Sequence, residues 1–70
     1  MIRLRIIELL EEQQKTKYWL YKRMEMSYGN FNKLVNNETS SIRFENLEKL
    51  SLLLNCPIDD LFEITRSETE

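Results

Sequence analysis

The stretch that decides the fold runs from residue 16 to residue 37 and reads TKYWLYKRMEMSYGNFNKLVNN. Thr16 is a residue type favoured at helix N-termini, where its hydroxyl can accept a hydrogen bond from a free backbone amide. Leu20 and Met24 follow at a spacing of four residues, which places them on the same side of a helix. The sequence therefore predicts a helix over residues 17–24 whose inward positions are Leu20 and Met24.

A second helix start follows almost at once. Ser27 is another good N-cap, and Phe31, Leu34 and Val35 repeat at helical spacing behind it. This pattern predicts a helix over residues 28–36. The connection between the two helices is only about three residues long, and such a short turn makes two helices cross at a large angle.

The flanking sequence adds three more short helices to this pair. An apolar stripe begins at Ile2 and predicts a helix over about residues 2–13. A fourth helix, ended by Asn55, and a short fifth helix are indicated by two further apolar sets: Phe44, Leu47, Leu50, Leu53 and Leu54, and then Ile58, Leu61 and Phe62. The predicted fold is a compact all-α domain of five helices over residues 1–65, with a polar tail at 66–70.

The composition argues against catalysis. The 70 residues include no histidine, one cysteine and one glycine, so a zinc site, a Cys–His pair and a glycine-rich phosphate loop all lack their residues. We therefore expect neither enzymatic activity nor a cofactor. Cys56 is interpreted as a reduced, buried residue of a cytoplasmic protein. No secretory signal or membrane-spanning stretch is expected.

Charge is distributed unevenly along the chain. The net charge is −2, which by itself argues against binding to nucleic acid. Residues 1–43 nevertheless hold eight basic and five acidic side chains, a balance of +3, whereas residues 44–70 hold two basic and seven acidic ones, a balance of −5. Such an arrangement allows a locally basic face on an acidic protein, although ordinary charged surfaces explain it equally well.

The segment quoted above resembles the helix-turn-helix of the Cro/CI-type (XRE, lambda-repressor-like) family. The resemblance rests on apolar residues at Leu20, Met26, Phe31 and Leu34, on Ser27, and on the polar pair at residues 36–37. Residues 41–50 and 54–62 also look like this family, so the resemblance covers roughly residues 2–64. It implies a lambda-repressor-like fold, a prokaryotic or phage transcriptional regulator, and DNA as the partner.

Two positions depart from the family pattern. The family usually has alanine at the position of Tyr21, where the two helices pack closely, so the tyrosine is expected to leave outward along the helix pair. Glycine is usual at the position of Glu25, where the turn needs a left-handed backbone. A residue with a side chain costs roughly 1–2 kcal/mol there, and we predict that Glu25→Gly stabilises the protein.

The resemblance implies that the helix over 28–36 enters the major groove of double-stranded DNA. Its exposed face is what remains after the core positions Met26, Phe31, Leu34 and Val35 are removed. Asn32 can pair with adenine and Lys33 can reach guanine, so these two are expected to read bases, and Gly29 would allow close approach of the backbone. The predicted base-facing residues are Tyr28, Gly29, Asn32, Lys33 and Asn36.

DNA phosphates are expected at both ends of this helix pair. Lys17 combines a cation with the free amides of a helix N-terminus, and the polar loop before the fourth helix supplies small donors and one cation. The predicted phosphate contacts are Lys17, Ser27, Asn37, Thr39, Ser40, Ser41 and Arg43. Plain solvation is an almost equally good explanation for each of these residues taken singly.

Three questions stay open at this level. One recognition helix offers little surface for specific binding, so a homodimer is expected, with Leu61, Phe62 and Ile64 as its surface or simply as core residues. Tyr18 and Trp19 cannot both face the core, so one of them should pack and the other be exposed. The alternative function is a degenerate helix-turn-helix that binds a protein, such as a toxin or an anti-repressor.

Overall fold

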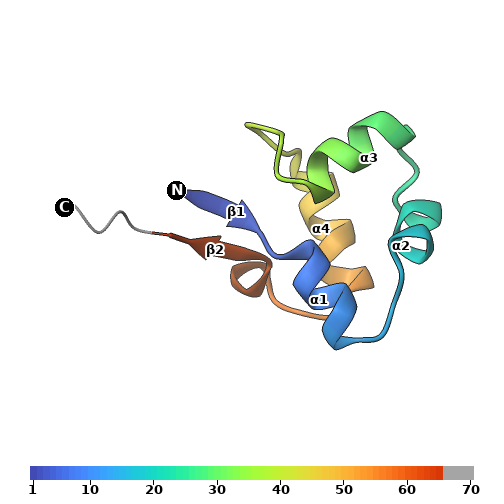
Figure 1. Ribbon diagram of the computed structural model, residues 1–70, viewed down its shortest axis with the longest axis horizontal. Helices are drawn as coiled ribbons and strands as arrows, with labels where there is room; N and C mark the ends of the chain where they lie inside the picture. Colours follow the sequence, from blue (N-terminus) through green and yellow to red (C-terminus); the bar gives the residue numbers. More distant parts are fainter. Residues whose placement is uncertain (66–70) are drawn as a thin grey trace.

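The computed structural model describes residues 1–65 and shows four helices, one 3-10 helix and two short strands (Figure 1). The predicted tail at 66–70 lies outside the described residues. In chain order the elements are β1 (Ile2–Leu4), α1 (Ile6–Glu12), α2 (Lys17–Met24), α3 (Tyr28–Val35), α4 (Phe44–Leu53), η1 (Ile58–Leu61) and β2 (Phe62–Ile64).

One apolar cluster holds these elements together. Each helix contributes the residues of one side, which is the arrangement expected when short helices surround a single small core. Phe31 is the largest fully buried side chain of this cluster. The core consists of Leu4, Ile6, Leu9, Leu10, Leu20, Met24, Phe31, Leu34, Val35, Leu50, Leu54 and Leu61.

The prediction of a helix over residues 2–13 is wrong at its start, because residues 2–4 form a strand. β1 pairs with β2 in antiparallel register, with Ile2 opposite Ile64 and Leu4 opposite Phe62. The backbone amide of Arg5 continues the ladder by donating to the carbonyl of Leu61 at 2.8 Å. The two ends of the described chain therefore lie side by side (Figure 1), and the fold is not all-α.

The predicted fifth helix is wrong for the same reason. Its four residues Ile58–Leu61 form a 3-10 helix, and Phe62 already belongs to β2. A segment this short has no room for a stable α-helix, while extended backbone at residues 62–64 satisfies its hydrogen bonds on β1. Apolar residues do recur at helical spacing in both terminal segments. Residues 2–4 and 62–64 nevertheless form strands, because each segment pairs with the other across about 60 residues of sequence.

The helix pair itself matches its prediction closely. Thr16 Oγ1 accepts from the amide of Trp19 at 3.0 Å, and Ser27 Oγ accepts from the amide of Asn30 at 3.2 Å, so both predicted N-caps are confirmed. Glu25 has φ 59° and ψ 45°, the left-handed backbone expected at this turn. The turn is also tied to α4, because Lys49 Nζ donates to the carbonyl of Met24 at 3.1 Å.

Side-chain placement differs from the predicted stripes at several positions. Phe44 begins α4 but is 88% exposed, because no described element covers it, and Leu52 is 73% exposed. Met26 and Cys56 are half-buried rather than fully buried. Burial raises the pKa of the Cys56 thiol, and the carboxylate of Asp60 adds to the effect.

The open question about the two aromatic residues of α2 is settled. Trp19 is half-buried and packs against the core, while Tyr18 is exposed. None of the helices within residues 1–65 has the length and apolar character needed to span a membrane.

Candidate nucleic-acid interface

α3 presents a continuous polar face to solvent. Its apolar residues point into the core, which leaves the opposite side of the helix free. Tyr28 is 61% exposed, Gly29, Lys33 and Asn36 are exposed, and Asn32 is half-buried. All five residues predicted to face bases therefore lie at the surface of α3 or at its C-cap.

Tyr21 determines how Tyr28 is held. The Tyr21 side chain is half-buried, packs against the core and lines the groove between α2 and α3. Its centroid lies 5.3 Å from that of Tyr28 at 88° and 5.4 Å from that of Phe31 at 60°. Such edge-to-face contacts are favourable for aromatic pairs, so the departure at Tyr21 orients Tyr28 at the start of α3.

Lys17 lies beside this face. It is the first residue of α2 and is exposed. A shallow groove between α2 and α3 is lined by Lys17 and Tyr18 on one side and by Tyr28 and Asn32 on the other. The first cation of α2 is thus placed next to the polar face of α3, where a phosphate beside a bound base could reach it.

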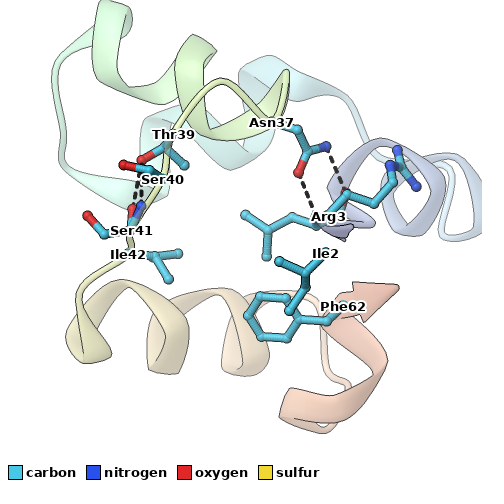
Figure 2. Close-up of a pocket in the computed structure, with 9 residues that line it drawn as sticks. Ile2, Arg3, Asn37, Thr39, Ser40, Ser41, Ile42 and Phe62 are labelled. Atoms are coloured by element: carbon cyan, nitrogen blue, oxygen red, sulfur yellow. Dashed lines mark hydrogen bonds between the residues drawn. The ribbon is translucent and has the colours of Figure 1, made fainter. Parts of the chain in front are cut away.

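The loop before α4 lies on the other side of α3. Thr39 Oγ1 donates to the carbonyl of Ser41 at 2.7 Å, and the Ser41 amide is 3.4 Å from the same oxygen, so the loop is held in a tight turn (Figure 2). Ser40 and Arg43 are exposed. A groove lined by both polar and apolar side chains joins this loop to Lys33 of α3 and has a volume of about 230 Å³.

Asn37 has a structural role that the sequence did not predict. Its side-chain oxygen accepts from the Leu4 amide at 2.6 Å, and its side-chain nitrogen donates to the Leu4 carbonyl at 3.1 Å (Figure 2). Both polar ends of the amide are therefore engaged with β1, in the manner of a neighbouring strand. Asn37 is therefore a structural residue that fastens β1 to the C-terminal end of α3, and because one of its two amide N–H groups has no partner among these bonds, its predicted phosphate contact stays a prediction.

Sequence reasoning missed three polar residues near the interface. Asn30 is exposed on α3, and Asn46 of α4 lines the same groove between α3 and the loop. Lys49 ties the turn to α4 and lies 3.6 Å from a carboxylate oxygen of Glu25. The exposed polarity of Asn30 could have been noticed from its position beside Phe31, but Asn46 and Lys49 reach this region only through the packing of α4.

Arg43 has a carboxylate within reach. Its guanidinium nitrogen lies 3.4 Å from Glu45 Oε1, and both side chains are largely exposed. An exposed pair at this distance is worth little, so a phosphate can replace the glutamate without a large loss. Arg43 is thus compatible with its predicted role.

The comparisons agree with this geometry. The sequence profile of the Cro/C1-type HTH DNA-binding domain matches residues 5–67. The crystal structure of a "putative DNA-binding protein" from Bacteroides fragilis is similar to this chain, with a TM-score of 0.76 and 28% sequence identity. The similarity covers 90% of this chain and 100% of the other. No match was found among curated proteins.

Proposed function

The chain belongs to the family of Cro/C1-type helix-turn-helix DNA-binding domains, and from this membership we propose that it binds double-stranded DNA sequence-specifically as a transcriptional repressor. α3 is the recognition helix. Asn32 and Lys33 read base edges in the major groove, since an amide suits adenine and an ammonium suits guanine. Such a regulator works where the DNA is, in the cytoplasm of a prokaryotic cell.

The observation that carries this proposal is the arrangement around α3. Its polar face lies between Lys17 on one side and the loop of Thr39, Ser40, Ser41 and Arg43 on the other. A helix in the major groove has one phosphate backbone on each side, so contacts are needed at both edges. The hydroxyl groups of Ser27, Ser40 and Ser41 supply neutral donors beside these cations, whereas the Thr39 hydroxyl already donates to the Ser41 carbonyl.

Salt-dependent binding to duplex DNA tests the proposal. Affinity is measured for a duplex from upstream of the gene and for an unrelated duplex, over a range of KCl concentrations. Lys33→Ala is expected to reduce the preference for the specific duplex by about 1–3 kcal/mol. Lys17→Ala should weaken both duplexes alike and reduce the salt slope by about one unit. Absence of binding to either duplex at low salt would falsify the proposal.

We propose that the regulator is a homodimer, but its predicted surface needs revision. Leu61 is 0% exposed and belongs to the core, so it cannot contact a partner, and Phe62 is half-buried. Ile64 remains 70% exposed. A larger exposed apolar group lies on α4 and η1, where Phe44, Leu52 and Ile58 line one groove with Leu47.

This apolar group favours a second copy as its partner. Phe44 follows Arg43 directly, so the group borders the proposed phosphate loop, and two half-sites require two recognition helices held together. Sedimentation of two matched variants distinguishes the surfaces. Leu52→Glu should dissociate the dimer, and Ile64→Glu should leave it intact. The reverse result would place the interface on the terminal strands.

A protein-interaction module is the second candidate function, and the same exposed apolar group is the observation that favours it. The duplex titration separates the two candidates. If the protein binds another protein and not DNA, Lys33→Ala does not change any duplex measurement. If it is a repressor, Lys33→Ala lowers its affinity for the specific duplex.

A further inference from the structure

The outer surface of α2 is basic and aromatic. Between Glu12 and Glu25 the chain contains four cations and no acid. Three of these cations lie on or beside the solvent side of the helix together with two aromatic rings. We call this surface the α2 basic face and define it as Lys15, Tyr18, Trp19, Lys22 and Arg23.

The cations of this face lie on rings rather than on carboxylates. Lys15 Nζ is 4.3 Å from the centroid of the Trp19 ring, and the Arg23 guanidinium carbon is 4.6 Å from the same centroid. Lys22 Nζ is 5.8 Å from the centroid of the Tyr18 ring. Arg23 also donates to the carbonyl of Trp19 at 2.9 Å. The rings hold the cations in place without neutralising them.

Four other cations of the described residues are paired with carboxylates. Arg3, Arg5, Arg43 and Lys49 each have a carboxylate within 4.0 Å. Within residues 1–65, the three cations of the α2 basic face have no such neighbour, and they share this with Lys17 and Lys33 of the proposed DNA interface. A group of like charges without counter-ions is unfavourable by itself, so an anionic ligand would relieve it.

Helix electrostatics do not explain the whole set. Lys22 and Arg23 lie in the last turn of α2, where the helix dipole favours a cation. Lys15 precedes the N-cap, and cations are disfavoured at that end. The helix dipole therefore accounts for Lys22 and Arg23 but not for Lys15, which is held by its contact with the Trp19 ring.

The α2 basic face is continuous with the proposed DNA interface. Tyr18 lines the groove between α2 and α3 together with Lys17, Tyr28 and Asn32. In Figure 1, α2 lies beside the N-terminal end of α3. One extended polyanion can therefore contact both surfaces at once.

We propose that the α2 basic face binds further phosphates of the same DNA duplex, beyond those reached from Lys17 and the loop before α4. This inference rests on the proposed function, since it requires α3 to hold the duplex. Lys22 and Arg23 donate to phosphate oxygens, and the Trp19 ring orients Arg23 and Lys15 toward the backbone. The face carries no base specificity, because a phosphate backbone is the same at every sequence.

The test compares two doubly substituted proteins on a mixed-sequence duplex of about 20 base pairs, two helical turns. The test variant is Lys22→Gln with Arg23→Gln. The control variant is Asn55→Asp with Thr65→Glu, two exposed positions away from α2 and α3 that change the net charge by the same amount. The dependence of log affinity on log KCl is measured for each, and thermal unfolding confirms that each is folded.

The proposal predicts that the test variant flattens the salt slope by about two units, since each phosphate contact contributes about 0.9, while the control keeps the wild-type slope. The double variant Lys22→Arg with Arg23→Lys, which keeps both positive charges, should show the wild-type salt slope. Equal slopes for test variant and wild type overturn the inference, and so do equal losses in test and control variants, which indicate only long-range charge. If the wild-type slope persists in the test variant but Lys17→Ala flattens it, the proposed function stands and this inference fails.

Discussion

The two ends of the chain and the helix pair α2–α3 use charged and polar groups in opposite ways. At the ends, Arg3 bridges Glu8 at 2.8 Å and Glu63 at 2.7 Å, and Arg5 lies 3.3 Å from Glu12. On the helix pair, the cations of the α2 basic face lie against aromatic rings. The arginines near the two terminal strands are paired within the fold, whereas the cations of the α2 basic face have no carboxylate partner within residues 1–65.

This difference indicates which residues matter for stability and which for binding. A polar group with a protein partner is costly to remove, because its partner is left unsatisfied. A polar group that faces solvent is nearly free to change in the unbound protein. Substitutions in the two regions should therefore separate stability from DNA affinity.

The adjacent residues Asn36 and Asn37 give the largest expected contrast. Asn37→Gly keeps the left-handed backbone, with φ 60°, but leaves the amide and carbonyl of Leu4 without a partner. We expect a loss of about 1–3 kcal/mol in the free energy of unfolding, measured by urea denaturation. Asn36→Ala should leave that free energy unchanged and weaken duplex binding. Equal stability of the two variants would contradict the assignment of Asn37 as a structural residue.

Gly29 tests whether the α3 backbone approaches DNA closely. A Cβ added there meets no atom within 4 Å, and glycine within a helix costs about 1 kcal/mol relative to alanine. Gly29→Ala is thus expected to raise the free energy of unfolding by about that amount. Duplex affinity should fall if the DNA approaches the α3 backbone. A variant both more stable and equally tight in binding would mean that Gly29 has no role at the interface.

Glu25 lies at the turn of the helix pair, with left-handed backbone and an exposed side chain. Glu25→Gly relieves roughly 1–2 kcal/mol of backbone strain but adds the flexibility of glycine, about 0.5–1 kcal/mol. The contact with Lys49 at 3.6 Å is exposed and contributes little. The net expectation is a gain of up to about 1 kcal/mol. A lower melting temperature would show that the Lys49 contact outweighs the strain.

Glu8 gives the smallest expected effect and tests the paired charges at the chain ends. The hydrogen bond from Arg3 lowers the pKa of the Glu8 carboxyl in the folded protein. Its contribution to stability is therefore fully present above about pH 4.3, the ordinary pKa of glutamate, and is lost as the pH falls through the lowered value.

The contribution of Glu8 should stay below about 1 kcal/mol, because the pair is partly exposed to solvent. Glu8→Gln should flatten the loss of stability between about pH 4.3 and lower pH, as followed by thermal unfolding. Glu11→Gln, at an exposed position of the same helix, is the control. An unchanged pH profile for Glu8→Gln would mean that its bond to Arg3 contributes nothing.

Local signals explain why the helix pair could be predicted. An N-cap hydroxyl, a left-handed turn residue and an apolar spacing of three and four residues all act within one or two helical turns. The predicted helix over 17–24 matches α2, and that over 28–36 ends one residue beyond α3. The contacts of Tyr21 with Tyr28 and Phe31 were not predicted.

Distant partners explain the errors. Whether Ile2 belongs to a helix or a strand depends on Ile64, and the structural role of Asn37 depends on Leu4. Leu61 looks like Phe62 and Ile64 in the sequence, yet it is buried while Ile64 is exposed. No window of a few residues contains the information that separates these cases.

By itself, the sequence determined the helix-turn-helix, its two caps, its strained turn and the polar face of α3, because each depends on neighbours along the chain. Only the tertiary structure decided which charges are paired and which are free. It also decided that residues 2–4 and 62–64 form a strand pair and that Asn37 bonds the free edge of β1. Strand pairing, burial and ion pairing depend on groups brought together from distant positions, and the free surface is what remains once those contacts are made.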